Sequence, residues 1–154
     1  MGMAYIRTKQ LQEAQSAFEK AVDLNPKFLN PYFPLAELLI ANKQFDKAAP
    51  LLQQAMVEDS QDWRWPYELA FCSARQGQWE EAVEYGQVAL RRPNSATKVH
   101  LLLADVYSNS GKVAKAVEEL EEFERLDPQS PYIGRVREVL PQLRLQASSR
   151  DEHP

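Results

Sequence analysis

The sequence contains little of what disulfide, metal and membrane structures require. Among its 154 residues there is one cysteine, Cys72, so no disulfide can form within the chain. His100 stands at a helix position expected to pack and His153 near the C-terminus, so neither indicates a metal site. No apolar run approaches the length of a membrane span, and residues 1–7 lack the apolar core of a signal peptide. The compartment stays open, with the cytoplasm slightly favoured because the sequence needs no disulfide.

Motifs that carry catalysis are also missing. The sequence has no glycine-rich phosphate loop, no paired Cys or His at metal-ligand spacing, and no nucleophile motif. A net charge of −4 argues against nucleic acid or an anionic membrane surface as the main partner. We therefore expect no cofactor, no metal, no membrane insertion, no nucleic-acid binding and no independent enzyme activity.

The chain does contain a repeat with a period of 34 residues. Four alanines keep this spacing, namely Ala14, Ala48, Ala82 and Ala116. An apolar residue precedes each of them by three positions: Leu11, Phe45, Trp79 and Val113. Seven residues after each alanine stands a second small or apolar residue: Ala21, Ala55, Ala89 and Phe123. A fixed period in this range predicts stacked structural repeats.

Apolar spacing within each period predicts helices. Between the breaks, apolar residues recur every three or four positions, as at Leu35, Leu38 and Leu39, and no strand pattern occurs. Short polar turns alternate with breaks that contain proline. We expect helices over residues 11–24, 30–42, 45–58, 63–76, 79–91, 95–110, 113–126 and 131–140. A short helical stub is expected before residue 9, with a polar turn over Thr8–Gln10 between it and the first of these helices.

Residues at fixed places in the period resemble the tetratricopeptide repeat. That family has Trp, Leu-Gly and Tyr on the first helix of a repeat, and Ala, Phe, Ala and Pro on and after the second. The first copy begins at the glycine and continues with Tyr5, Ala14, Phe18, Ala21 and Pro26. The second has Tyr32, Leu35-Ala36, Leu39, Ala48, Leu52 and Ala55. The third has Leu69-Ala70, Ser73, Ala82, Gly86 and Ala89, and the fourth has Leu103-Ala104, Tyr107, Ala116, Leu120, Phe123 and Pro128. The Trp position is never filled by Trp.

The resemblance implies an all-α fold, a right-handed α-solenoid of antiparallel helix pairs. Four repeats would occupy about residues 1–28, 29–62, 63–96 and 97–130, the first truncated at its N-terminus. A C-terminal capping helix over 131–147 and a flexible tail over 148–154 would follow. Pro141 is expected to end or kink the capping helix. Because the chain starts inside the first helix of a repeat, we expect it to be part of a longer protein.

In this family the first helices of successive repeats line a concave groove, so the resemblance implies a scaffold that binds a protein or peptide. Phe33, Tyr67 and Phe71 come from adjacent first helices and predict one aromatic wall. Arg64, Arg75 and Lys98 around it favour a peptide with an apolar anchor and carboxylates. The groove-facing candidates are Met3, Ile6, Arg7, Asn30, Phe33, Glu37, Ile40, Arg64, Tyr67, Phe71, Ala74, Arg75, Lys98, Leu101, Asp105, Ser108 and Asn109.

Two other roles are weighed against this one. Family members that grip the acidic C-termini of chaperones need a set of Lys, Asn and Arg side chains. The corresponding places here hold Met3, Pro34 and Glu68, or Phe33, Glu37 and Leu102 one repeat later, which disfavours that partner. The alternative function is a repeat segment of a larger enzyme or envelope-assembly protein, serving stacking or self-association. An uncapped first repeat around Met3 and Tyr5 would then mediate homo-oligomers.

Some unusual residues are interpreted as packing. Gly86, inside a helix, predicts a close helix crossing with a large residue nearby. Cys72 is expected to be a small buried residue. Trp63 and Trp65 are expected to pack at a repeat junction in preference to forming an aromatic shelf on the groove. The acidic run over residues 118–124 is expected to be a solvated convex face.

Overall fold

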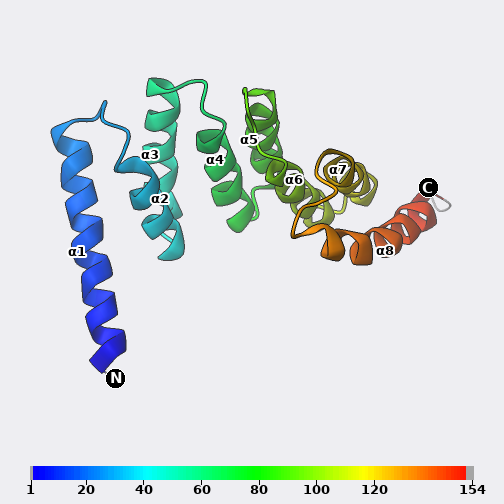
Figure 1. The fold of residues 1–154 in the computed structure, drawn as a ribbon, viewed down its shortest axis with the longest axis horizontal. Coiled ribbons are helices and arrows are strands. Elements are labelled where there is room, and N and C mark those ends of the chain that lie inside the picture. The colour runs from blue at the N-terminus through cyan, green and yellow to red at the C-terminus, as the bar shows by residue number, and fades with distance from the viewer. Residues whose placement is uncertain (1, 152–154) are drawn as a thin grey trace.

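A computed structural model describes residues 2–151 of the chain, with side chains described over 7–149. Eight α-helices make up this part, and no strand occurs in it. They are α1 (Gly2–Leu24), α2 (Tyr32–Ala41), α3 (Phe45–Glu58), α4 (Arg64–Arg75), α5 (Trp79–Arg91), α6 (Lys98–Asn109), α7 (Val113–Leu126) and α8 (Ile133–Asp151). They follow one another across the molecule from α1 at one end to α8 at the other (Figure 1). None of the described helices is both long and apolar enough to cross a membrane.

Three helix pairs repeat with the period seen in the sequence. Each helix packs on the next one, and the first helices α4 and α6 also touch each other. The turn within each pair contains one residue with a left-handed backbone, at Lys43 (φ 57°), Gly77 (φ 72°) and Gly111 (φ 79°). Each of these residues lies 34 positions after the previous one, so the same turn is used three times.

Small residues at the helix crossings are buried, as expected. Ala36, Ala70 and Ala104 on the first helices have almost no exposed surface, and neither do the periodic alanines of α3, α5 and α7. Larger side chains, among them Leu52 and Leu69, fill the space between these close approaches and are also fully buried. The helices therefore interlock through alternating small and large residues, which is how helix surfaces reach interior packing density.

Gly86 marks one of the closest crossings, between α5 and α6. A Cβ atom added at Gly86 would lie 2.5 Å from Cδ2 and 3.0 Å from Cγ of Leu103, which is itself fully buried. Real Cβ atoms do not approach carbon so closely, so an alanine here would push Leu103 out of place. This confirms that the glycine serves packing and that a large neighbour fills the space.

The N-terminal helix differs from the expectation. α1 is continuous from Gly2 to Leu24, so the predicted turn over Thr8–Gln10 is wrong. Lys9 stands one period before Lys43, and a left-handed lysine costs about 1–2 kcal/mol. At Lys43 the packing of α2 against α3 offsets that cost, whereas a helical Lys9 avoids it. Continuing the helix is therefore favoured.

The continuous α1 leaves partly open the face that a first helix folded back against it would cover. Ala14 and Ala21 are only half-buried, although Ala48 and Ala55, one period later, are fully buried. Leu11 keeps 44% of its surface exposed. α1 packs mainly on α2, so one of its sides remains open. Met1 lies outside the described residues, as do the side chains of Met3 and Tyr5.

The C-terminal helix also exceeds its predicted bounds. Pro141 lies inside α8 and does not end it, and residues 148–151, expected in the tail, are helical. Residues 152–154 lie outside the described part. Proline removes one backbone hydrogen bond, but α8 is held by its neighbour. Its buried residues Val136, Leu140 and Leu143 join a core cluster with Val117 and Phe123 of α7.

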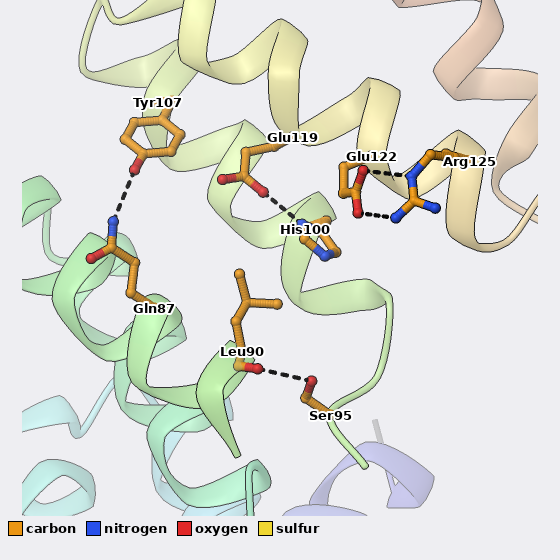
Figure 2. Close-up of polar contacts among 8 residues, drawn as sticks. All are labelled: Gln87, Leu90, Ser95, His100, Tyr107, Glu119, Glu122 and Arg125. Carbon is orange, nitrogen blue, oxygen red and sulfur yellow. Dashed lines mark hydrogen bonds and ion pairs between the residues drawn. The ribbon is translucent and has the colours of Figure 1, made fainter. Parts of the chain in front are cut away.

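The acids of the run on α7 are all at least partly exposed, as expected of a solvated face, and two of them also pair with arginines of α8. Exposed interhelical ion pairs join Glu124 to Arg137 at 2.7 Å and Glu121 to Arg144 at 2.8 Å. Two further acids of the run also have partners, Glu119 with His100 of α6 and Glu122 with Arg125 of its own helix (Figure 2). Exposed pairs contribute little each, about 0.2–1 kcal/mol, so the apolar seam carries most of the attachment of α8.

Polar contacts join other helices in the same region, as Figure 2 shows. The Gln87 amide of α5 donates a hydrogen bond to the Tyr107 hydroxyl of α6 at 3.5 Å. His100 of α6 and Glu119 of α7 are 2.6 Å apart, Nδ1 to Oε2. His100 thus connects two helices of one repeat, as well as filling the packing position assigned to it.

The Gly86 crossing predicts that Gly86→Ala changes the free energy of unfolding in opposite directions with and without the Leu103 side chain. Gly86→Ala gains about 0.8–1 kcal/mol of helix propensity but overpacks Leu103 at a cost of about 1–3 kcal/mol. It should therefore lower the free energy of unfolding by roughly 1 kcal/mol. In a Leu103→Ala background the clash is gone, and the same substitution should raise the free energy by about 1 kcal/mol.

Urea denaturation of the four proteins in this cycle measures both effects. Gly134→Ala is the matched control, because an added Cβ at this glycine of α8 meets nothing within 4 Å. It should be neutral or stabilising in both backgrounds. A Gly86→Ala effect of the same sign with and without Leu103 would contradict the packing account.

Candidate functional site

The predicted groove residues lie on three first helices. α2 carries Phe33, Glu37 and Ile40, α4 carries Arg64, Tyr67, Phe71 and Arg75, and α6 carries Lys98, Leu101, Asp105 and Asn109. Within each helix they recur every three or four positions, which places them along one face. We call the surface formed by these residues the first-helix wall. Arg7 is exposed on α1, while the side chains of Met3 and Ile6 lie outside the described residues.

Trp65 organises the junction between α2 and α4. Only 2% of its surface is exposed, and the Phe33 ring stacks on it with centroids 4.2 Å apart. Tyr32 meets it edge-on at 6.5 Å. The packing role expected for Trp65 is therefore confirmed. Phe33 is half-buried by this stack, so only part of its ring is available on the wall.

Arg64 is occupied by contacts within the chain. Its guanidinium lies 4.5 Å from the centroid of the Phe33 ring and forms an ion pair with Asp62. Hydrogen bonds to Arg64 hold the pKa of the Asp62 carboxyl below its usual range, even though partial burial acts in the opposite direction. An arginine that is already paired has less to offer a partner. Arg64 therefore contributes to the packing around Phe33 and has little free charge to offer a partner.

Lys98 brings α6 against α4. Its Nζ lies 4.5 Å from the centroid of the Tyr67 ring and 5.5 Å from that of Trp63. Trp63 meets Tyr67 edge-on, with centroids 5.7 Å apart. The two aromatic faces attract the ammonium group, since ring faces carry negative electrostatic potential. Tyr67 and Lys98, both predicted from the sequence, therefore act as one unit.

Glu68 was not among the candidates, although it lies within this electrostatic neighbourhood. Burial raises the pKa of the Glu68 carboxyl, the positive charge of Lys98 lowers it, and the negative charge of Glu37 raises it. The sequence did contain a signal for it. One period before and after Glu68 stand the apolar residues Pro34 and Leu102, so a carboxyl here breaks the pattern.

A cleft of about 280 Å³ lies between α4 and α6. It brings together five predicted residues with Trp79 and Leu102; the five are Phe71, Ala74, Arg75, Asp105 and Asn109. Trp79 and Leu102 were not predicted, because the first comes from a second helix and the second stands at a core position. Half-buried Phe71 and Trp79 form apolar lining beside the exposed Arg75.

The two charged residues at this cleft, Arg75 and Asp105, differ in their contacts within the chain. Arg75 is exposed and forms no ion pair with any residue that the structure describes. Asn109, in contrast, donates hydrogen bonds to the Asp105 carboxylate at 3.1 Å and to its carbonyl oxygen at 2.8 Å. The cleft thus combines an apolar lining, one available cation and one acid that already accepts a hydrogen bond.

The remaining candidates are not gathered at this cleft. Ile40 packs against the core formed by α2, α3 and α4, and Glu37 is exposed. Leu101 lines a different cleft, between α6 and α8. The wall therefore consists of separate features: an aromatic junction, a cation over two rings, and the clefts on either side of α6.

Neither the one cysteine of the chain nor the described residue types that bind metals form a metal site. Cys72 is buried, and burial together with the charge of Glu68 raises the pKa of its thiol to about 12. The thiol stays protonated and enclosed, which confirms its packing role. No group of three His, Cys, Asp or Glu suited to a metal ion occurs among the described residues.

Comparison with protein families gives one result. Two models, each described as a tetratricopeptide repeat, match the chain, one over residues 5–62 and 39–90 and the other over residues 97–130. Together these ranges include more than half of the chain. Among curated proteins, none matches this sequence.

Solved structures resemble the chain along most of its length. A crystal structure of MamA has a TM-score of 0.80 at 20% identity, covering 95% of this chain and 84% of MamA. The type III secretion chaperone SycD of Yersinia enterocolitica, in complex with a peptide of the translocator YopD, has 0.71 at 20%, with 77% and 94% covered. The TPR domain of Arabidopsis OM64 has 0.61 at 15%, with 71% and 88% covered. The likeness confirms the all-α, right-handed solenoid fold.

The charged neighbours of Glu68 predict that its pKa rises in one variant and falls in another. Lys98→Met removes a positive charge and should raise the pKa of Glu68 further, whereas Glu37→Gln removes a negative charge and should lower it. An NMR titration of the Glu68 side-chain carboxyl carbon measures both. Lys115→Met is the control, because Lys115 lies over Tyr107 on the last repeat. An unchanged pKa in Lys98→Met would contradict the placement of Lys98.

The sign for stability follows from the raised pKa. A carboxyl whose folded-state pKa lies above its ordinary value of 4.5 favours folding when protonated. This contribution is complete below about pH 4.5 and is lost as the pH rises through the raised folded-state pKa. Glu68→Gln cannot ionise, so the variant should retain this contribution to the free energy of folding at neutral pH.

Proposed function

The chain belongs to the tetratricopeptide repeat family, and from that premise we propose that it is a non-catalytic scaffold whose first-helix wall binds a peptide segment of a protein partner. The observation that carries the proposal is the cleft between α4 and α6. There the exposed guanidinium of Arg75, which forms no ion pair with a described residue, stands beside the half-buried rings of Phe71 and Trp79. Aromatic and arginine side chains dominate the binding energy of protein interfaces.

The chemistry of the cleft favours one class of peptide. An apolar side chain on the peptide would bury surface against Phe71, Trp79 and Leu102, and a neighbouring carboxylate would pair with Arg75. Asp105 on the other side of the cleft would repel a second carboxylate placed there. SycD, a structural relative with a bound peptide, supports a peptide as occupant. An affinity on the order of micromolar, about −8 kcal/mol, is typical of such a limited set of anchors.

Phe71 gives the decisive test, because packing and binding make different demands on it. A library of random short peptides displayed on phage is selected against the whole chain, and the affinity of a selected peptide is measured by fluorescence anisotropy. Phe71→Ala should weaken binding about tenfold, roughly 1.4 kcal/mol, after correction for any unfolded fraction. The matched control Tyr85→Ala truncates a half-buried aromatic of α5 and should lower the melting temperature alone.

Arg75→Glu provides an independent measurement in the same system. It should slow association of an acidic peptide and flatten the salt dependence of the association rate. Arg91→Glu, which reverses an exposed arginine of α5, should leave both unchanged. The wall assignment fails if Phe71→Ala alters only the melting temperature and Arg75→Glu leaves the association rate as it was.

Self-association through α1 is a second candidate function, favoured by the open side of that helix. Leu11 is 44% exposed, and Ala14 and Ala21 are half-buried at positions that later repeats bury fully. An apolar helix face of this kind gains free energy when another helix covers it. We expect a second copy of the chain to supply that cover at high concentration.

Analytical ultracentrifugation over rising protein concentration tests the second candidate. The chain should shift from monomer to dimer, and Leu11→Lys should move this shift to higher concentration. Leu145→Lys is the matched control, since Leu145 is an exposed leucine at the opposite end of the solenoid. A strict monomer at millimolar concentration would exclude self-association through α1.

A further inference from the structure

α8 occupies the place of a further first helix. It packs on α7 as α6 packs on α5. The period of 34 residues continues into it, so that Lys98, Leu101 and Asp105 of the wall are followed by Tyr132, Arg135 and Val139. Arg135 and Val139 lie within α8, and Tyr132 directly precedes it. The row of wall positions therefore extends one helix beyond α6.

A second cleft, of about 300 Å³, lies between α6 and α8. Its apolar lining comes from both helices, including Leu101 and Ala104 of α6 and Val139 and Leu143 of α8. Val139 is half-buried, so part of its side chain faces open space. Asp105 lines both this cleft and the one between α4 and α6, which makes the two clefts neighbours on either side of α6.

Arg135 gives the second cleft the same chemistry as the first. It lines the cleft, is exposed, and forms no ion pair with any described residue. The other arginines of α8 with described side chains, Arg137 and Arg144, are both paired with acids of α7. Among the α8 arginines with described side chains, Arg135 is thus the one without an ion pair to a described residue, as Arg75 is at the first cleft.

We propose that α8 is part of the binding surface, and that the cleft between α6 and α8 takes an apolar side chain of the partner peptide with a carboxylate next to it. This rests on the proposed function of the first-helix wall. The bound segment would carry two apolar anchors, one for each cleft, each beside an Asp or Glu that pairs with Arg75 or Arg135. Asp105 stands between the clefts and disfavours a carboxylate between the anchors.

The spacing of the anchors follows from helix packing. Neighbouring packed helices lie about 8–10 Å apart, so clefts on either side of one helix are separated by about that distance. An extended chain advances about 3.3 Å per residue. The two anchors should therefore be about three residues apart in an extended peptide.

Peptides selected from the displayed random library on the whole chain test this directly. They should be enriched in two apolar residues about three positions apart, each next to an acid. Val139→Asp, which charges the lining of the second cleft, and Arg135→Glu should each weaken binding of such a peptide about tenfold. A peptide in which lysine replaces the acid that pairs with Arg135 should bind the Arg135→Glu protein again, because the two charges are then exchanged.

Two matched controls separate binding from folding. Leu145→Asp changes an apolar residue of the same helix that is 74% exposed, and Arg91→Glu reverses an exposed arginine away from the wall. Both should keep the affinity within about twofold. Arg135 is exposed, so its reversal tests the proposal even if Val139→Asp loosens α8 from α7.

The outcomes distinguish this inference from the proposed function. If Phe71→Ala weakens binding while Val139→Asp and Arg135→Glu do not, the binding surface ends at α6 and α8 serves only as a cap. If the selection yields no peptide that binds, or if Phe71→Ala, Val139→Asp and Arg135→Glu all leave affinity unchanged, the first-helix wall is not the binding surface and both proposals fall.

Discussion

The close approach of helices at small residues is the constraint on which the structure depends. Each first helix reaches its own second helix through a pair of buried alanines, such as Ala70 and Ala82. At Gly86 even a methyl group is too large, because Leu103 fills the space. Since a larger side chain at these places would separate the helices, the spacing of small residues sets where each pair crosses. The direction in which each first helix presents its outer side chains, and so the whole wall, follows from these crossings.

Much of the fold was predictable because it depends on local residues that recur. The bounds of α3, α5 and α7 agree with the predicted ranges, since turns and apolar spacing mark both ends of each helix. The errors occur where distant contacts decide. A turn at Lys43 is held by the packing of α2, whereas the same kind of residue at Lys9 continues a helix. Likewise Pro141 would end an isolated helix, but α8 lies against α7 and continues past it.

The candidate site shows the same division. Matching the chain to the repeat pattern was enough to place the candidates on α2, α4 and α6. It was not enough to predict their contacts, because ion pairs and ring contacts depend on distances between helices. Arg64 and Arg75 look alike in the sequence, yet Arg64 is held by Asp62 and Phe33 while Arg75 stays free of ion pairs among the described residues. Glu68 was not chosen as a candidate, because its electrostatic coupling to Lys98 and Glu37 depends on distances between helices.

The open side of α1 has a consequence for how the molecule loses its structure. In a stacked array, stability is close to a sum of the terms contributed by each unit and by each contact between neighbours. An inner helix such as α4 has neighbours on both sides, whereas α1 packs mainly on α2. Backbone amides near α1 should therefore exchange their hydrogens through local opening, long before the middle of the chain does so. Among the described helices, α1 has the smallest contact with its neighbours and should be the first to open.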